Sequence, residues 1–352
     1  MLSRLAFIGL VLLIFVGLFA YAGGWLTPAR LTPAKLVATF QAVNGPHPGF
    51  RRNHAKGVCI GGWFDSNGDA SALSKADVFK PGRVPVVGRF ALAGGMPMQS
   101  DAKATVRSMA LRFLPASGQE WRTGMNNIPV FPVSTAQGFY EQLLASKPDP
   151  ATGKPDPAAM QQFLARHPDS ARALALIKAR QVSSGFFDSS FNSLDAFLFV
   201  APGGNVTPVR WSTVPARSSV AQMPSEAAGG DEDYLFEDLI SRVHEHPLQW
   251  RLLITIGQSS DPTNDATVAW PADRRQVDAG TIVIDSVASE DGGACKDINF
   301  DPLVLPAGIQ PSDDPLLSAR SAAYSRSFTL RAGEKKPPSA VTVEATKIGG
   351  RS

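Results

Sequence analysis

The first thirty residues carry a continuous apolar run, unlike the rest of the chain. No charged residue occurs between Arg4 and Arg30, and residues 5–26 are almost wholly apolar. This length predicts a helix that can cross a hydrocarbon core of about 30 Å. A cleaved signal peptide is the alternative, because Ala20-Tyr21-Ala22 has the small-x-small pattern of a cleavage site. The length favours an uncleaved anchor, and in either case Arg4 indicates that the body is exported.

Beyond this run, short segments rich in Val, Ile, Phe and Trp are separated by turns containing Gly, Pro and Asn. One strand is expected directly after the turn-rich residues 45–57. Other segments of this kind predict strands at 84–93, 104–115, 128–133, 194–202, 207–215, 250–258 and 280–289. Strands and helices do not alternate regularly, which favours an α+β fold with an antiparallel β-barrel over a parallel sheet.

Apolar positions at helical spacing predict four further helices, which cover residues 33–43, 157–167, 170–182 and 231–243. Pro168 separates the second from the third. Residues 146–157 should form an exposed loop, and the polar end of the chain a mobile tail. The chain therefore divides into a leader (1–26), a single body (27–335) and a C-terminal tail (336–352).

Composition excludes several classes of protein. Hydrophobic residues make up 44% of the 352 residues and charged residues 18%, so a large core is possible. A net charge of +3 is too small for a protein whose main partner is nucleic acid. With only Cys59 and Cys295, a disulfide scaffold and a cysteine-rich metal site are excluded, while a single bridge stays open.

Two candidate metal motifs fail on inspection. Asp65, Asn67 and Asp69 have the first spacings of a calcium loop, but the Gly and Glu that the loop requires further on are missing. His244 and His246 have no third ligand nearby and are expected to be exposed at a helix end. The chain also has no GxSxG, HExxH, P-loop or GxGxxG motif, which removes the commonest hydrolase, zinc-protease and nucleotide-binding readings.

Three separated patches carry candidate chemistry: residues 51–57, residues 124–131, and Arg320 with Tyr324 and Arg331. The third has offsets of four and eleven residues, close to one and three helical turns. If the segment is helical, Tyr324 and both arginines share one face. Nearby positive charge favours the ionised form of a phenol, and a ferric ion would favour it further.

In this order, the motifs resemble those of the haem catalases: RxxHAKG at 51–57, VxxRF at 86–90, GxNNxPVF at 124–131, FDP at 300–302 and RxxxYxxxxxxR at 320–331. The resemblance covers roughly residues 40–335. Within this superfamily the short chain and the leader look most like the catalase-related peroxidases. The resemblance implies a catalase-like antiparallel barrel surrounded by helices, with one haem b.

The same resemblance implies a role for each matched residue. Tyr324 would be the iron ligand, with Arg320 hydrogen-bonded to its phenolate. His54 would move a proton between the two oxygens of a peroxide, and Asn126 would orient that peroxide; alignment through Pro129 favours Asn126 over its neighbour Asn127. The haem propionates would pair with Arg51, Arg89 and Arg331. The rings over the haem would be Phe131 and Phe139, although plain core packing explains either of them almost as well.

Two departures from the family pattern qualify these roles. True catalases have a serine directly after the Arg-Phe pair, and its hydroxyl bonds the distal histidine; here the residue is Ala91, so His54 must be held otherwise or more loosely. Only 21 residues follow Arg331 (352 − 331), so we expect neither the C-terminal helical domain nor the long N-terminal arm of the large enzymes. Their tetramer is therefore not assumed, and the oligomeric state stays open.

We therefore expect a haem-dependent peroxidase, anchored in the membrane or exported to the periplasm. It would reduce organic hydroperoxides or hydrogen peroxide with an external electron donor and so protect against oxidative stress. A true catalase, a hydroperoxide dehydratase or isomerase, and a non-enzymatic haem-binding module are the alternatives. The peroxide is the expected substrate, and the sequence does not identify the electron donor.

Overall fold

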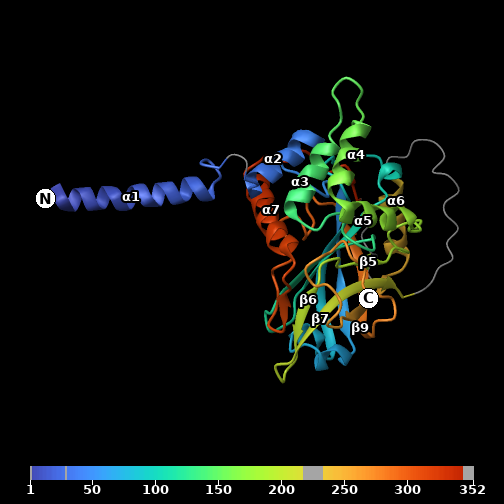
Figure 1. Cartoon of the computed structure of the whole chain (residues 1–352). Helices are drawn as coiled ribbons and strands as arrows, with labels where there is room; N and C mark the ends of the chain where they lie inside the picture. Colours follow the sequence, from blue (N-terminus) through green and yellow to red (C-terminus); the bar gives the residue numbers. More distant parts are fainter. Residues whose placement is uncertain (1, 28–29, 217–232, 344–352) are drawn as a thin grey trace.

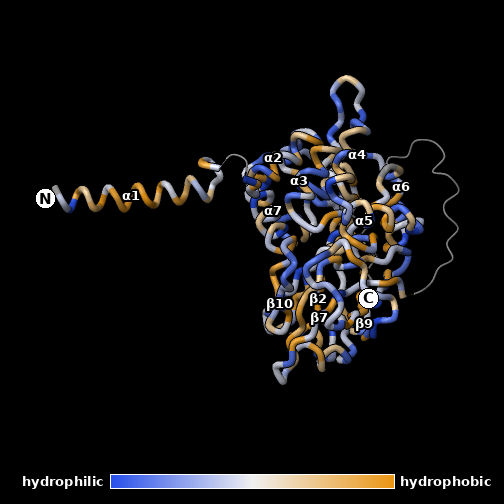
Figure 2. The backbone as a smooth tube through the Cα atoms, viewed as in Figure 1, coloured by the Kyte–Doolittle hydropathy of each residue, from blue (hydrophilic) through white to orange (hydrophobic). Residues whose placement is uncertain are grey.

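The computed structural model describes residues 2–27, 30–216 and 233–343. Helix α1 (Leu2–Ala22) extends away from the body, and Figure 2 shows it as a largely apolar rod. Residues Ser3–Ala22 have a mean hydropathy of 2.7, and none of the apolar window is buried. A single apolar N-terminal helix of this kind fits either an anchor or a signal peptide.

The body is built around a closed barrel of eight antiparallel strands (Figure 1). Neighbours around the ring are β7-β5-β4-β3-β2-β1-β9-β8, and pairing of β8 with β7 closes it. The strands are β1 (Gly57–Ser66), β2 (Gly82–Leu92), β3 (Arg107–Phe113), β4 (Trp121–Asn126), β5 (Phe191–Asn192), β7 (Val206–Pro215), β8 (Leu248–Ile256) and β9 (Gln276–Ala288). The predicted α+β class with an antiparallel barrel is confirmed.

Two short strands lie outside the ring. Strand β6 (Phe197–Val200) pairs with the first half of β7, and β10 (Ile309–Pro311) pairs with β6. The second half of β7 pairs with β8 along one edge, but along its other edge only with the two residues of β5, which in turn pairs with β4 through the single pair Asn126–Asn192. The barrel therefore has fewer strand-pairing residues at β5 than at its other strands.

Aromatic side chains fill the barrel. Phe113 and Trp121 stack with ring centroids 4.7 Å apart, and Trp211 meets Trp121 edge-on at 5.0 Å. Such pairs stabilise a core beyond the area that they bury. The barrel curves at a β-bulge in β1, where a Cβ on Gly62 would lie 1.9 Å from the Val283 carbonyl oxygen, so only glycine fits.

Seven α-helices occur in the described chain, and three of them, α2, α3 and α7, pack on one another at one end of the body (Figure 1). Helix α7 starts sharply because Asp314 accepts from the backbone N–H of Leu316 and Pro315 occupies the first turn. Beyond α1, the helices are α2 (Pro33–Asn44), α3 (Ala136–Ala145), α4 (Pro157–Arg166), α5 (Pro168–Ala179), α6 (Tyr234–Glu245) and α7 (Pro315–Ala332), with 3₁₀ turns at Asp69–Ala72, Asp77–Phe79 and Asp101–Lys103.

Most predicted elements occur where the pattern placed them, including the strand after residue 57 and the helix break before Pro168. The strand predicted at 128–133 is wrong, because Pro129 and Pro132 have no N–H for a ladder and the segment is irregular. The strand of this region is β4, directly before it. Helix α3 was also missed. The exposed loop at 146–157 is confirmed.

The end of the chain differs from the expected tail. Residues 336–343 lie against the body, where Val341 is buried and Lys336 pairs with Asp291. The rest of the predicted tail, 344–352, lies outside the described residues. The open question of the cysteines is answered: Cys59 on β1 and Cys295 form a disulfide across 236 residues of chain.

Candidate active site

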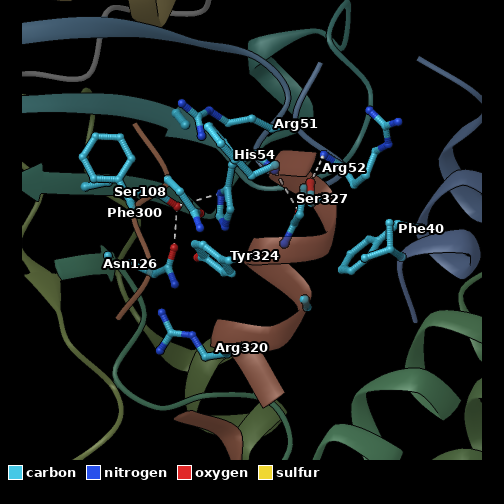
Figure 3. A pocket seen from close by; sticks show the side chains of 18 of the residues that line it. Phe40, Arg51, Arg52, His54, Ser108, Asn126, Phe300, Arg320, Tyr324 and Ser327 are labelled. Atoms are coloured by element: carbon cyan, nitrogen blue, oxygen red, sulfur yellow. Dashed lines mark hydrogen bonds between the residues drawn. The ribbon is translucent and has the colours of Figure 1, made fainter. Parts of the chain in front are cut away.

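One cavity between the barrel and helices α2, α3 and α7 brings all the predicted site residues together (Figure 3). It contains about 1260 Å³ of space not filled by protein atoms, part of it open to solvent. The predicted residues on its wall are Arg51, His54, Arg89, Asn126, Phe131, Phe139, Arg320, Tyr324 and Arg331. Residues from five segments, hundreds of positions apart, thus form one site.

His54 lies in the loop before β1 with a φ of 55°, a left-handed conformation that residues other than glycine rarely adopt. The side chain of Asn53 holds this loop, since its Oδ1 accepts from the N–H groups of His54 at 3.0 Å and Gly94 at 2.9 Å. Burial, together with the charges of Arg89 and Arg320, lowers the pKa of His54 to about 3. The ring is therefore neutral, and one of its nitrogens carries a lone pair.

Ser108 on β3 connects His54 with Asn126. Its Oγ lies 3.0 Å from His54 Nδ1 and donates a hydrogen bond to Asn126 Oδ1 (Figure 3). In the β2–β3 register Ser108 stands directly opposite Ala91. The hydroxyl that Ala91 lacks is thus supplied from the neighbouring strand. The sequence pattern missed Ser108 because its position next to His54 depends on the strand register.

Asn126 and Asn127 have different surroundings. Asn126 lines the cavity at the end of β4. Asn127 exchanges two hydrogen bonds with Arg107, its N–H donating to the carbonyl at 3.0 Å and its Oδ1 accepting from the backbone N–H at 2.8 Å. Asn127 therefore fixes the strand end, and Asn126 is the asparagine available to a ligand.

Tyr324 and Arg320 project from the same face of α7, one turn apart (Figure 3). A Cβ on Gly124 would lie 3.8 Å from Tyr324 Oη, so the phenol reaches the backbone of β4. Arg320 hydrogen-bonds Tyr324 and forms an ion pair with buried Asp195. Burial alone lowers the pKa of Arg320, but Asp195 and Tyr324 outweigh it and raise the pKa, so the guanidinium stays charged.

Two carboxyl groups behind Arg320 were missed by the sequence pattern. Burial raises the pKa of Asp195 despite the charge of Arg320. Burial and the nearby Asp195 raise the pKa of Asp314 to about 7. Asp314 caps the helix that carries Tyr324, whereas Asp195 is far away in the sequence and only the fold brings it to Arg320.

The three predicted propionate-binding arginines surround one buried carboxylate, Glu290. Arg89 binds it through two hydrogen bonds of 2.7 and 2.9 Å, and Arg51 lies 3.5 Å away. Burial would raise the pKa of Glu290, but Arg89 outweighs it and the pKa is lowered. Arg331 Nη2 has no hydrogen-bond partner among the described residues. Three guanidinium groups around one carboxylate leave an excess of positive charge at this end of the cavity.

Apolar side chains form the remaining wall. The rings of Phe131 and Phe139 lie 5.8 Å apart, and Phe40 of α2 lies 5.7 Å from Phe139. Leu36 and Val37 continue this surface along α2. Phe131 and Phe139 therefore line the cavity and also pack on each other.

These features fit a haem. The apolar wall suits a flat macrocycle, the phenol of Tyr324 suits its iron, and the excess of positive charge suits the propionates. Among the described residues, no group of three His, Cys, Asp or Glu side chains is placed so that it could hold a metal ion. Asp65 instead pairs with Arg83 on the surface.

Residues 29–338 match the family described as Catalase. The chain belongs to the catalase family. The catalase-related peroxidase of Synechococcus elongatus is 35% identical over 301 residues, which are 86% of this chain and 89% of that protein. The catalase-related peroxidase of Mycolicibacterium paratuberculosis is 31% identical over 304 residues, 86% and 96% of the two chains.

The larger catalases are more distant relatives of this catalase-family protein. The catalase of Pseudomonas aeruginosa is 27% identical over 80% of this chain and 56% of its own length. A solved bacterial catalase has a TM-score of 0.69 at 23% identity and covers 85% of this chain and 60% of its own. Its likeness confirms the fold. The family and these relatives show that the protein is an oxidoreductase acting on peroxide.

Proposed function

We propose that this catalase-family protein is a haem-dependent peroxidase that reduces organic hydroperoxides or hydrogen peroxide with an external electron donor. The observation that carries the proposal is a proton acceptor, His54, and an amide donor, Asn126, on the wall of the same cavity as the phenol of Tyr324. Catalase-family proteins generally bind haem. A mere haem carrier would have no use for a proton acceptor and an amide donor beside the iron site.

Tyr324 would hold the iron through Oη, and Arg320, which hydrogen-bonds the phenol, would stay charged beside it. Arg51, Arg89 and Arg331 would pair with the propionates. Gly57 makes room for this cluster, since a Cβ there would lie 2.6 Å from the guanidinium carbon of Arg89. Bound haem would supply the redox chemistry, which is the transfer of two electrons to the O–O bond.

The chain's own residues would manage the proton. With Nδ1 of His54 directed to Ser108, Nε2 is the ring nitrogen left to take the proton from one peroxide oxygen and return it to the other. Asn126 Nδ2 would donate to the peroxide and orient it. The hydroperoxide ROOH then yields ROH and water, and the external donor provides two electrons and two protons.

Two observations support peroxidase over catalase activity. Relatives at 35% and 31% identity are named catalase-related peroxidases. The wall formed by Leu36, Val37 and Phe40 suits the carbon chain of an organic hydroperoxide. The Ala91 substitution gives no support, because Ser108 supplies the missing hydroxyl.

An experiment with haem-loaded protein tests the proposal. Oxygen release from hydrogen peroxide and oxidation of a donor dye with cumene hydroperoxide are measured in parallel, with His54→Ala as the control. We expect low oxygen release, clear dye oxidation, and loss of both in the variant. Vigorous oxygen release with negligible dye oxidation would establish a catalase, and a rearranged product formed without donor would establish a dehydratase.

We also propose that α1 anchors the body outside the cytoplasm, where the enzyme protects against oxidative stress. The Cys59–Cys295 disulfide supports an exported body, since disulfides persist in oxidising compartments and are rare in the cytosol. In this proposal residues 1–26 form the anchor and 27–335 the catalytic domain. Cleavage of the leader to give a soluble periplasmic enzyme is the alternative.

A further inference from the structure

We propose that Ser108 is a positioning residue that makes His54 and Asn126 act as one unit. Its single hydroxyl sets both the tautomer of the His54 ring and the orientation of the Asn126 amide. This inference rests on the proposed function, because it assigns the side chain that prepares the proposed proton acceptor and amide donor for peroxide.

The strand register places Ser108 where it can serve both residues. Ser108 is directly opposite Asn126 in the β3–β4 pair and directly opposite Ala91 in the β2–β3 pair. Side chains opposite each other on antiparallel strands lie on the same face, with Cβ atoms about 5 Å apart. Ser108 is buried at the cavity wall, and His54 reaches its hydroxyl from the loop before β1.

The direction of the hydrogen bonds follows from the number of protons. A serine hydroxyl has one proton, and Ser108 donates it to Asn126 Oδ1, an atom that only accepts. Toward His54 Nδ1 the hydroxyl therefore has only a lone pair to offer. In this arrangement His54 Nδ1 carries the ring proton and Nε2 is unprotonated; the ring also has a hydrogen bond with the backbone of Leu92.

The same bond fixes the amide. With Oδ1 of Asn126 held by Ser108, its Nδ2 is turned the other way and presents two N–H donors. In this series of hydrogen bonds, His54 Nδ1 donates to Ser108 Oγ, which donates to Asn126 Oδ1. An unprotonated nitrogen on His54 and an N–H donor on Asn126 are left for a ligand. If the amide were reversed, the hydroxyl would donate to the ring instead, and both site groups would have the wrong polarity.

The tautomer of His54 decides whether its free nitrogen can accept a proton. A neutral histidine ring has two tautomers, and only the one protonated at Nδ1 can accept a proton at Nε2. Without the Ser108 hydroxyl, Nδ1 of His54 and Oδ1 of Asn126 would both lose a partner in a buried site, where an unsatisfied polar group is costly. Ring and amide would then rearrange independently of each other.

The test compares four variants of the full chain in detergent. Ser108→Ala removes the hydroxyl, Ser108→Thr keeps it, and Ser108→Ala combined with Ala91→Ser returns it from the opposite strand. Ser74→Ala is the matched control, since Ser74 is also buried and donates to the Gly308 carbonyl at 2.9 Å, and it does not line the cavity. The chain has only five histidines, so ring ¹⁵N signals are assignable with His54→Gln.

We expect Ser108→Ala to lower kcat/KM for peroxide roughly 10- to 1000-fold at unchanged haem content. The kcat/KM of Ser108→Thr and of Ser74→Ala should stay within a few-fold of the parent value. Adding Ala91→Ser to Ser108→Ala should raise kcat/KM at least tenfold. In the haem-free chain, ¹⁵N spectra should show His54 protonated at Nδ1, and a mixture of tautomers in Ser108→Ala.

Two outcomes would overturn the inference: His54 protonated at Nε2 in the parent chain, or kcat/KM within twofold of the parent in Ser108→Ala. The spectra need neither haem nor turnover, so they remain decisive if Ser108→Ala folds poorly. If the parent shows the Nδ1–H tautomer but oxidises no donor, the positioning role stands and the proposed peroxidase function fails.

Discussion

Glu290 is the only carboxylate that the described residues place against Arg51 and Arg89, which makes Glu290→Gln an informative perturbation of the haem-free protein. The side chains of Arg89 and Glu290 are 3% and 6% exposed, so this is a buried pair. Replacing the carboxylate by an amide leaves buried Arg89 and partly buried Arg51 without their carboxylate partner. Breaking a buried pair from one side typically costs about 3–5 kcal/mol, because the remaining charge is uncompensated.

Glu120→Gln is the matched control. Glu120 also lies between two arginines, Arg112 at 2.6 Å and Arg122, but these side chains are 20–30% exposed. Ion pairs that water reaches contribute only about 0–1 kcal/mol. For a body of this size, about 3–5 kcal/mol corresponds to a shift in Tm of roughly 5–15 °C.

Thermal unfolding of the haem-free full chain in detergent measures both variants. We expect Glu290→Gln to lower Tm by several times more than Glu120→Gln. Equal shifts of a degree or two would refute the reasoning, because they would mean that the arginine cluster is solvated and carries no buried excess charge.

The pH dependence provides a second check on the same variant. The folded-state pKa of Glu290 is lowered, so its contribution is present above the unfolded pKa of about 4.3 and is lost as pH falls through the folded value. The difference in Tm between the parent and Glu290→Gln should therefore be full at neutral pH and narrow below about pH 4. A difference that widens in acid would contradict this sign.

Three further expectations concern the ligand, the disulfide and the topology. Tyr324→Phe should leave a folded protein that has lost most of its haem; full haem with an unchanged ferric spectrum would show that another residue is the ligand. Cys59→Ser should lower the free energy of unfolding by about 2–5 kcal/mol, because the bridge closes a loop across 236 residues, and reductant should have the same effect on the parent but none on the variant. A reporter fused after residue 352 should be active only if it works in the exported compartment, and activity of a cytoplasm-specific reporter would overturn the proposed orientation.

The sequence predicted those parts of the site that depend on local spacing. Arg320, Tyr324 and Arg331 share a face because their spacing is helical, and this requires no knowledge of the rest of the chain. Ser108 and Glu290 were beyond such reasoning. Ser108 meets His54 through a strand register, and Glu290 reaches Arg89 across 201 residues of chain. Such partners are determined by how the barrel closes, which no local pattern encodes.

The errors in the fold have equally local causes. Residues 128–133 have strand-like composition, but two prolines remove the N–H donors that a strand needs. The strand β4, Trp-Arg-Thr-Gly-Met-Asn, was missed because its composition is not typical of a strand. Ala91 alone left open whether His54 is held otherwise or more loosely, and the structure shows that it is held by Ser108 of the opposite strand.

The two-residue strand β5 is the weakest connection in the closed barrel. The other seven strands are longer, and β5 pairs with β4 only through Asn126 and Asn192. The side chain of Asn192 strengthens this connection by donating to the Ile128 carbonyl at 2.9 Å. The residue proposed to orient peroxide therefore stands at the weakest seam of the ring, where the fewest backbone hydrogen bonds must break for the wall to yield. The proposed orientation of peroxide and the closure of the barrel therefore both depend on Asn126.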